Sequence, residues 1–313
     1  MWQGFGLSTQ VKKICRVVIL MTQIVILDEM ENEVVEKIKR LGSVVYLPAN
    51  LKEALSSAEV LIVRSRTKVT SELLALAPNL RIVARAGVGL DNIDTKACEK
   101  RGIRVINTPG ASANAVAELT IGHILSAMRF IAKAHHQMKN KIWDKKNLTG
   151  QELEGKTLGV IGYGRIGSLV GKKASALGMA VVAYNPPPRR EDGIARFVEL
   201  DELLRESDVI TLHVPSTPET KKLINEKTIA KMKKGVFIIN TARGDVIDEE
   251  ALYNACKSGK IAAAALDVYE KEPYAGKLLE LENVFFTPHL GAATKEAQAR
   301  IGEELVNYLR ALI

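Results

Sequence analysis

Short apolar runs alternate with amphipathic stretches along most of this 313-residue chain. The runs, such as residues 22–29 and 60–65, are continuous and rich in β-branched residues, which is typical of parallel strands buried on both faces. The stretches between them, such as residues 32–42, have helical periodicity, so the pattern is a series of βαβ units. The length suits two cores better than one. The sequence therefore predicts an α/β fold with two doubly wound parallel-sheet domains.

The order of the elements predicts how the chain is divided. A first βαβ series ends near residue 109, an amphipathic helix is expected over residues 113–139, and a second series starts at residue 157. The last helix is expected to return to the first unit, which makes that domain discontinuous. We expect one domain from residues 21–115 plus 290–313 and the other from residues 116–289. Residues 1–20 precede the first predicted strand, and we expect a poorly ordered extension there.

Composition argues against several classes of partner. The net charge is +8, but the basic residues are dispersed and no aromatic residues interleave with them, so we expect no nucleic acid partner. The sequence contains no run of eighteen apolar residues, so we expect no membrane span. Cys15, Cys98 and Cys256 form no CxxC pair and no zinc-ligand spacing. We therefore expect reduced thiols, no metal and a cytoplasmic location.

The sequence Gly162-Tyr163-Gly164-Arg165-Ile166-Gly167 follows a predicted strand and opens a predicted helix. In that context G-x-G-x-x-G predicts a dinucleotide site, whereas an isolated match would be weak. Gly162 permits the sharp turn, Gly164 lets a pyrophosphate approach, and Gly167 lets the helix pack on the strand. The helix N-terminus then faces the phosphates. The alternative is a tight turn that binds nothing.

Asn185 ends the next predicted strand, where an acid usually accepts hydrogen bonds from the adenosine ribose. An amide can bond a ribose hydroxyl, but it does not repel a 2′-phosphate. Arg189 and Arg190 follow and can meet such a phosphate. The sequence favours NAD and leaves NADP open.

Polar residues also follow the later strands of the second series. Arg243 follows one strand, Asp267, Glu270 and Glu272 follow the next, and His289 follows the last. In an open parallel sheet the carboxyl ends of the strands meet at the cofactor crevice. We therefore expect an arginine, an acid and a histidine at one place.

Such a trio suits the oxidation of a hydroxyl group beside a carboxylate. The histidine takes the hydroxyl proton, the acid orients the ring and favours its protonated form, and the arginine holds the substrate carboxylate. Each residue also has an ordinary structural interpretation, such as an ion pair of Arg243 with Asp245 or Asp248. Their combination with a dinucleotide turn favours the enzyme.

From Met21 to its end the chain resembles the D-isomer-specific 2-hydroxyacid dehydrogenase family, through "GYGRIG", "NTARGDVIDEEAL", "ALDVYEKEP" and "TPHLGAATKEAQ". Through "LIVRSRTKVT", "RAGVGLDNID" and "NTPGASANAVAEL" it is most similar to the phosphoglycerate dehydrogenases of that family. The resemblance implies a flavodoxin-like substrate domain, a Rossmann coenzyme domain and bound NAD. It also implies a homodimer built largely on the long helix and the coenzyme domain. It also implies a small 2-hydroxy or 2-keto acid substrate, phosphorylated in the phosphoglycerate dehydrogenases.

The resemblance assigns roles to individual residues. It implies that Arg243 binds substrate, that Glu272 tunes the base and that His289 donates or accepts the proton. It implies coenzyme contacts at Gly162, Gly164, Arg165, Ile166, Gly167, Asn185, Val214, Thr241, Ala242, Asp267, His289, Gly291 and Ala292, and substrate contacts at Arg64, Arg85, Val88, Gly89, Asn114 and Arg243.

Under this resemblance, Arg64 and Arg85 matter for the choice of substrate. Both end apolar strands of the first unit, where their side chains can project into the cleft between the domains. In phosphoglycerate dehydrogenases the matching arginines meet the substrate phosphate. The alternative is a salt bridge with Asp91, Asp94 or another nearby acid.

Three functions remain open at this point. The first is oxidation of 3-phosphoglycerate to 3-phosphohydroxypyruvate, the first step toward serine. The second is reduction of glyoxylate, hydroxypyruvate or another unphosphorylated 2-keto acid. The third, from a different class, is a corepressor-like scaffold that senses NAD(H) without turnover.

Overall fold

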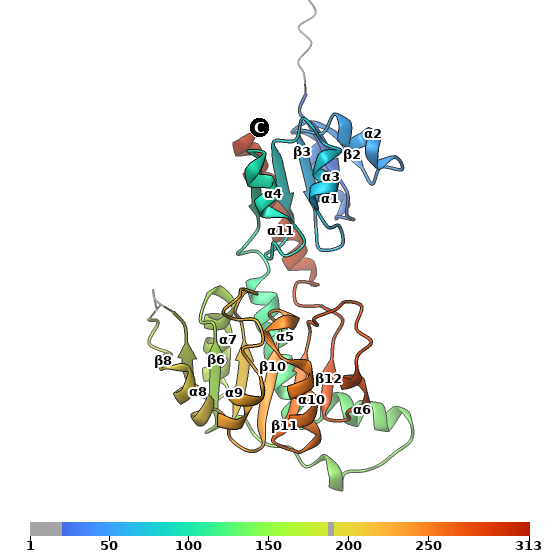
Figure 1. The fold of residues 1–313 in the computed structure, drawn as a ribbon. Helices are drawn as coiled ribbons and strands as arrows, with labels where there is room; N and C mark the ends of the chain where they lie inside the picture. The colour runs from blue at the N-terminus through green and yellow to red at the C-terminus, as the bar shows by residue number, and fades with distance from the viewer. Residues whose placement is uncertain (1–20, 187–190) are drawn as a thin grey trace, which may run out of the picture.

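The computed structural model describes residues 21–186 and 191–313. Two parallel sheets form two units, one above the other in Figure 1, which confirms the predicted fold class. The predicted extension at residues 1–20, together with Arg189 and Arg190, lies outside the described residues.

The first unit is a five-stranded parallel sheet with strand order β2-β1-β3-β4-β5. This is the order of flavodoxin-like folds. The three central strands are almost entirely buried, and the edge strands β2 and β5 are partly exposed. The elements are β1 Gln23–Ile26, α1 Asn32–Lys39, β2 Ser43–Tyr46, α2 Leu51–Ser56, β3 Val60–Val63, α3 Ser71–Ala75, β4 Ile82–Arg85, α4 Thr95–Lys100 and β5 Arg104–Asn107.

The second unit is a seven-stranded parallel sheet with order β12-β11-β10-β9-β6-β7-β8. The order reverses at β6, the strand that carries the glycine turn, as in Rossmann folds. The short edge strand β8 was not predicted. The elements are β6 Thr157–Ile161, α7 Arg165–Ala176, β7 Ala180–Tyr184, β8 Ala195–Phe197, α8 Leu200–Glu206, β9 Val209–Leu212, α9 Glu226–Lys231, β10 Val236–Asn240, α10 Glu249–Lys257, β11 Ile261–Leu266 and β12 Val284–Phe286, with 3₁₀ turns η1 Lys146–Leu148, η2 Gly244–Val246 and η3 Lys277–Glu280.

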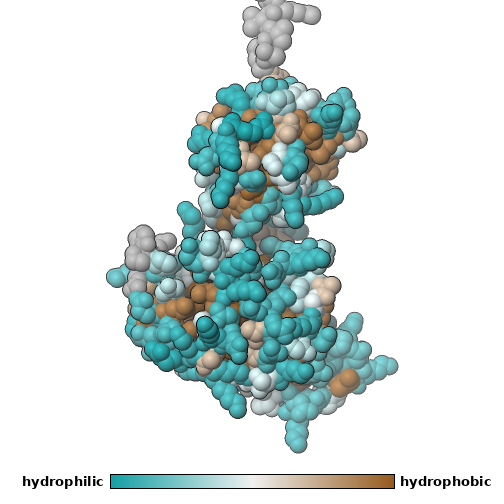
Figure 2. Space-filling model, in the orientation of Figure 1, coloured by the Kyte–Doolittle hydropathy of each residue, from teal (hydrophilic) through white to brown (hydrophobic). Residues whose placement is uncertain are grey.

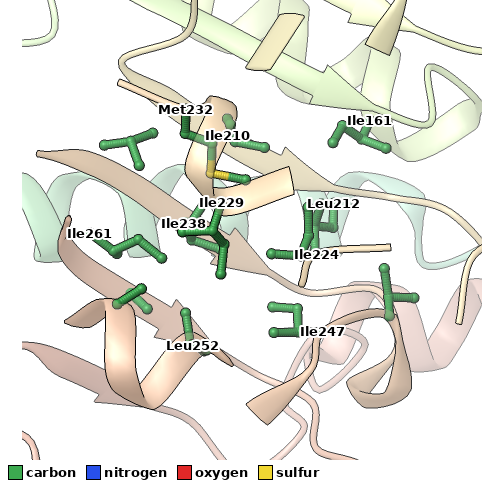
Figure 3. Packing of buried hydrophobic residues seen from close by; sticks show 14 of the residues in the cluster. Ile161, Ile210, Leu212, Ile224, Ile229, Met232, Ile238, Ile247, Leu252 and Ile261 are labelled. Atoms are coloured by element: carbon green, nitrogen blue, oxygen red, sulfur yellow. The ribbon is translucent and has the colours of Figure 1, made fainter. Parts of the chain in front are cut away.

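Buried apolar side chains lie on both faces of the sheet in the second unit. Figure 3 shows one face, where Ile210 and Leu212 of β9 and Ile238 of β10 pack against the helices around them. The other face is covered by α7 and by α5 (Ala113–Arg129). Side chains packed at this density resist small displacements, so the strand ends form a rigid base for the loops that follow them.

The last helix, α11 (Lys295–Leu312), packs on the first sheet (Figure 1). Its residues Ile301, Leu305 and Leu309 are buried in the core of the first unit. At Gly302 a Cβ would overlap the side chain of Val34, so the absence of a side chain allows α11 to lie close against α1. The exact domain boundaries at residues 115 and 289 stay a prediction.

The prediction of a single helix over residues 113–139 is wrong. The chain forms α5, then Phe130 in a left-handed conformation (φ 55°), then α6 (Ile131–Lys139). The two helices are bent by 66°. A left-handed residue cannot continue a right-handed helix, so α6 leaves the core and projects from the second unit (Figure 1). In the described part of the chain no single helix is long and apolar enough to span a membrane, and only this bent pair passes that test jointly.

Candidate active site

The glycine turn has the geometry that its spacing predicts. Gly162 has φ +96°, and a Cβ there would meet the backbone of His213 at 2.7 Å. A Cβ at Gly167 would overlap the carbonyl oxygen of Gly162, which is how closely α7 packs on the turn. Gly164 is the N-cap of α7, and nothing lies within 4 Å of where its Cβ would be. The open position and the first N–H groups of α7, which have no acceptor within the helix itself, suit a pyrophosphate.

The residues expected to flank the coenzyme lie at the ends of neighbouring strands. Asn185 directly follows β7, and its amide donates to the carbonyl of Pro186 at 2.9 Å. Val214 follows β9, and its side chain would lie 2.9 Å from a Cβ on Gly162. Both positions are therefore at the same edge of the sheet as the glycine turn.

The loop after β10 holds Arg243 and is braced by a buried residue that the sequence analysis missed. The Asn240 side chain accepts from the Ala242 N–H at 3.0 Å and donates to the Arg243 carbonyl at 2.9 Å. The Thr241 hydroxyl lies 2.9 Å from the Thr120 hydroxyl of α5. These bonds fix the loop conformation, so the start of the Arg243 side chain is well positioned.

His289 follows β12 and forms a pair with Glu272. Its Nδ1 lies 2.9 Å and 3.1 Å from the two carboxylate oxygens of Glu272. The Tyr269 N–H donates to the same carboxylate at 3.3 Å, and the ring of Tyr269 stacks on that of Tyr274, 4.6 Å between centroids. The carboxylate engages Nδ1, so Nε2 remains for proton exchange with a substrate.

Asp267 organises the turn on which His289 lies. Its carboxylate is buried and accepts from the hydroxyl of Thr287 at 2.6 Å, from the N–H of Leu290 at 2.7 Å and from the N–H of Gly291 at 2.8 Å. His289 itself has φ +56°, a left-handed conformation that a residue with a side chain seldom adopts. The three bonds offset the cost of that conformation. Ala292 follows the turn and packs on the core of the first unit.

Two arginines meet over the glycine-rich loop after β4. A Cβ at Gly87 would overlap the guanidinium of Arg85, and a Cβ at Gly89 would overlap that of Arg243. Both guanidinium groups therefore lie directly on the Gly87–Gly89 backbone. Within the described ranges, no hydrogen bond uses the N–H of Val88 or Gly89. The loop thus offers two cations and two free donors to an anion.

Asp91 bonds one of these arginines and acts on the other through its charge. Arg243 Nε donates to Asp91 Oδ2 at 2.7 Å, a salt bridge between the two units. Burial lowers the pKa of Arg85 to about 10, the charge of Arg243 adds to the lowering, and Asp91 opposes it. Arg85 Nε is buried and has no hydrogen-bond partner among the described residues. A second anion at this place would satisfy Arg85.

Arg64 and Asn114 differ from Arg85 in that their side chains already have partners. Arg64 donates to the carbonyl of Glu29 at 2.9 Å and to the side chain of Gln298 in α11 at 2.6 Å. The predicted alternative, a salt bridge of Arg64 with Asp91 or Asp94, is not among its contacts. The Asn114 amide donates to Glu118 within α5 at 2.8 Å.

The loops after β10, β11 and β12 are thus neighbours. A Cβ at Gly244 would overlap the backbone of Tyr269 and Glu270, so the loop that holds Arg243 lies against the loop that leads to Glu272. The sheet brings together an arginine, a carboxylate–imidazole pair and a dinucleotide turn. Across the described residues, no group of three histidine, cysteine or acidic side chains has the arrangement of a metal site.

Comparison with protein-family models matches residues 121–291 to the NAD-binding domain of the D-isomer specific 2-hydroxyacid dehydrogenases. The chain belongs to this family. The matched residues run from within α5 to the turn after His289 and include the glycine turn. The second unit is therefore the NAD-binding domain that this family shares.

Individual relatives agree with this assignment. The chain is 53% identical over 260 residues to a hydroxypyruvate reductase of Thermotoga maritima, an alignment that covers 82% of this chain and 85% of the relative. It is 45% identical over 302 residues to a D-3-phosphoglycerate dehydrogenase of Methanocaldococcus jannaschii, with 94% of this chain and 58% of the relative covered. The chain therefore spans little more than half the length of that dehydrogenase.

A solved structure shows the same architecture. The D-lactate dehydrogenase from Aquifex aeolicus, complexed with NAD and lactic acid, superposes with a TM-score of 0.83 at 36% identity. The alignment covers 92% of this chain and 94% of that chain. The likeness extends over both units.

Proposed function

We propose that the protein is an NAD-dependent D-2-hydroxyacid dehydrogenase of the phosphoglycerate dehydrogenase type, which interconverts 3-phosphoglycerate and 3-phosphohydroxypyruvate in serine biosynthesis. The observation that carries the enzymatic part is the pairing of His289 with Glu272 at 2.9 Å at the edge of the sheet that holds Arg243 and the glycine turn. The relatedness to phosphoglycerate dehydrogenases over 94% of the chain supports the substrate.

Each residue of the proposed site has one task. Arg243 holds the substrate carboxylate, together with the free N–H groups of Val88 and Gly89. During oxidation His289 Nε2 takes the proton of the substrate hydroxyl, and Glu272 stabilises the imidazolium that results. Bound NAD supplies the hydride acceptor. During reduction the imidazolium returns its proton to the carbonyl oxygen.

The structure favours Arg85 over Arg64 as the ligand of a substrate phosphate. Arg64 is bonded to Glu29 and Gln298, whereas Arg85 has a buried Nε without a partner. Charge-assisted hydrogen bonds contribute about 1.5–3 kcal/mol each. We therefore expect Arg85→Ala to raise KM about 10- to 100-fold for phosphohydroxypyruvate, and far less for glyoxylate.

Steady-state kinetics of Arg85→Ala and Arg64→Ala on both substrates test this assignment. Arg64→Ala serves as the comparison: it loses the ties to Glu29 and Gln298, so its main effect is expected on the melting temperature. An equal rise in KM for phosphohydroxypyruvate and glyoxylate in Arg85→Ala would remove the phosphate contact from the proposal.

The second candidate function is reduction of hydroxypyruvate. It is favoured by the 53% identity to a hydroxypyruvate reductase, a relative of which the alignment covers 85%. A panel of phosphohydroxypyruvate, hydroxypyruvate, glyoxylate and pyruvate, each with NADH and with NADPH, separates the two functions. The phosphorylated substrate should have the highest kcat/KM if Arg85 binds a phosphate. The NADPH arm tests whether Asn185 admits a 2′-phosphate.

A homodimer completes the proposal. The projection formed by α6 and the residues after it exposes Ile131, Met138, Ile142 and Trp143, the last with 79% of its surface accessible. In Figure 2 an apolar patch is visible on this projection amid hydrophilic surface. Exposed apolar side chains that gather on one element favour an interface, and a second copy is the occupant we propose. Sedimentation of Trp143→Lys should show dissociation where the wild type is dimeric; an unchanged dimer would place the interface elsewhere.

A further inference from the structure

One face of α5 contacts the three loops that form the proposed active site. Val116, Thr120 and His123 are spaced by four and three residues, so their side chains lie on the same side of the helix. All three are buried, and α5 lies against β10, β11 and β12. Figure 1 shows the helix behind these strands. The helix that connects the two units therefore also packs against the loops of the proposed active site.

Each residue on this face meets a different part of the site. Val116 would lie 3.2 Å from a Cβ on Gly291, in the turn after His289. The Thr120 hydroxyl lies 2.9 Å from that of Thr241, in the loop that leads to Arg243. His123 Nε2 lies 3.0 Å from the hydroxyl of Thr287, two residues before His289.

The hydrogen bonds of Thr287 fix the tautomer of His123. The Thr287 hydroxyl has one proton, and it donates that proton to Asp267 at 2.6 Å. At the contact with His123 the hydroxyl oxygen must therefore accept, so Nε2 of His123 must carry a hydrogen. Burial lowers the pKa of His123, partly opposed by the charge of Asp267, which agrees with a neutral ring. The hydrogen bonds thus require a hydrogen on Nε2, and burial favours the neutral ring, so we expect the neutral Nε2–H tautomer.

The hydrogen bonds from His123 through Thr287 to Asp267, which we call the relay, continue to the turn that holds His289, the proposed base. Asp267 uses its remaining capacity to accept from the N–H groups of Leu290 and Gly291, which flank the left-handed turn at His289. The backbone of Thr287 is held as well, since its carbonyl accepts from the hydroxyl of Tyr269 at 2.8 Å and from the N–H of His289 at 3.0 Å. A shift of Thr287 would move the turn and the imidazole with it.

We propose that His123 is a positioning residue for His289: as the neutral Nε2–H tautomer it orients the Thr287 hydroxyl toward Asp267, and the carboxylate then holds the turn that aims the imidazole. The effect on turnover rests on the proposed dehydrogenase function, whereas the tautomer does not. His123 touches neither substrate nor coenzyme in this role. It acts through Thr287 and Asp267.

Four variants test the relay. His123→Leu removes the Nε2–H donor and fills its place with an apolar side chain of moderate size. Thr287→Val removes the hydroxyl. Because a misplacement of about 1 Å can cost about 100-fold in rate, we expect each to lower kcat by about 10-fold with KM for the keto acid within about 2-fold. His123→Gln restores a donor near Nε2, and Thr287→Ser restores the hydroxyl. Both should recover kcat to within about 3-fold of the wild type.

The double variant and a matched control separate positioning from general stability. Because both groups belong to one relay, His123→Leu/Thr287→Val should be no slower than the slower single variant, whereas independent effects multiply. Ser207→Ala removes another buried hydroxyl, bonded to the carbonyl of Leu203 at 2.7 Å just before β9 begins. It should lower the melting temperature without lowering kcat. Multiplying effects, or a fall in kcat for Ser207→Ala of equal size, would overturn the proposal.

A measurement on the wild type tests the tautomer of His123 without any turnover. In ¹⁵N-histidine NMR at pH 7, His123 should show a protonated Nε2 and an unprotonated Nδ1. Assignment follows from the signal absent in His123→Gln. An Nδ1–H tautomer or a charged ring at that pH overturns the relay. If the tautomer is as expected but no 2-keto acid is reduced, the proposed function fails while the hydrogen-bonded relay stands.

Discussion

Replacing Asp91 by asparagine should strengthen substrate binding, although it removes a salt bridge to the proposed substrate arginine. Asp91 belongs to the first unit and bonds Arg243 of the second through Nε at 2.7 Å. In that position its carboxylate competes with the carboxylate of an incoming substrate for the same guanidinium. The neutral amide leaves Arg243 free and also removes negative charge from the vicinity of Arg85.

The exposure of the two partners sets the magnitude. The Arg243 side chain is 29% exposed and that of Asp91 is 54% exposed, and Arg243 uses only Nε for this bond. Pairs of this kind contribute about 0.2–1 kcal/mol. An anion that displaces Asp91 must overcome that free energy, so its loss should tighten binding by about 1.4- to 5-fold.

Initial-rate kinetics with a 2-keto acid and inhibition by oxalate measure this effect. For Asp91→Asn we expect KM and the oxalate inhibition constant to fall together by that factor, with kcat unchanged, since the competition concerns binding before chemistry. Asp94→Asn is the matched control: it removes one charge from the same loop, keeps the cap on the N–H of Ala97, and does not touch Arg243. A higher KM in Asp91→Asn than in this control would mean that Asp91 positions Arg243 for substrate, which refutes the competition.

Three further outcomes follow from the geometry. Gly164→Ala should weaken NADH binding, measured by fluorescence titration, and should change the melting temperature little, because its Cβ enters open space. Gly167→Ala should lower both the affinity for NADH and the melting temperature, because its Cβ overlaps backbone atoms. Burial lowers the pKa of His213 to about 3, whereas a histidine in an unfolded chain has a pKa near 6.5. Between these two pH values the unfolded state binds more protons than the folded state. The free energy of unfolding therefore falls as the pH falls through that range. Denaturant unfolding should therefore show the wild type losing up to about 1.4 kcal/mol per pH unit more than His213→Gln between pH 6 and 4; parallel curves contradict this. Gly302→Leu should lower the melting temperature of the whole chain by separating α11 from Val34, and an unchanged melting temperature would contradict the close packing.

The parts of the structure that could be predicted from the sequence depend on local or repetitive features. Each glycine of the turn at Gly162–Gly167 is required by its own backbone conformation or by its immediate neighbours, so the motif alone indicates the geometry. The grouping of Arg243, Glu272 and His289 at one edge follows from parallel strands, whose carboxyl ends all point the same way.

The parts that could not be predicted depend on single contacts between distant segments. His123 meets Thr287 164 residues further along the chain, and Asp91 meets Arg243 152 residues further along. Neither has a neighbouring pattern that distinguishes it from an ordinary buried histidine or surface acid. The break at Phe130 interrupts a sequence with uniform helical periodicity and without glycine or proline at that position, so periodicity alone predicts a continuous helix.

The central claim is that His289 exchanges the substrate proton beside bound NAD. The most direct test compares the wild type with His289→Ala in two assays: NADH oxidation with phosphohydroxypyruvate, hydroxypyruvate and glyoxylate, and NADH binding by fluorescence. Loss of turnover by at least about 100-fold on every accepted keto acid, with NADH affinity retained, is the predicted result. Turnover in His289→Ala close to that of the wild type would contradict the account.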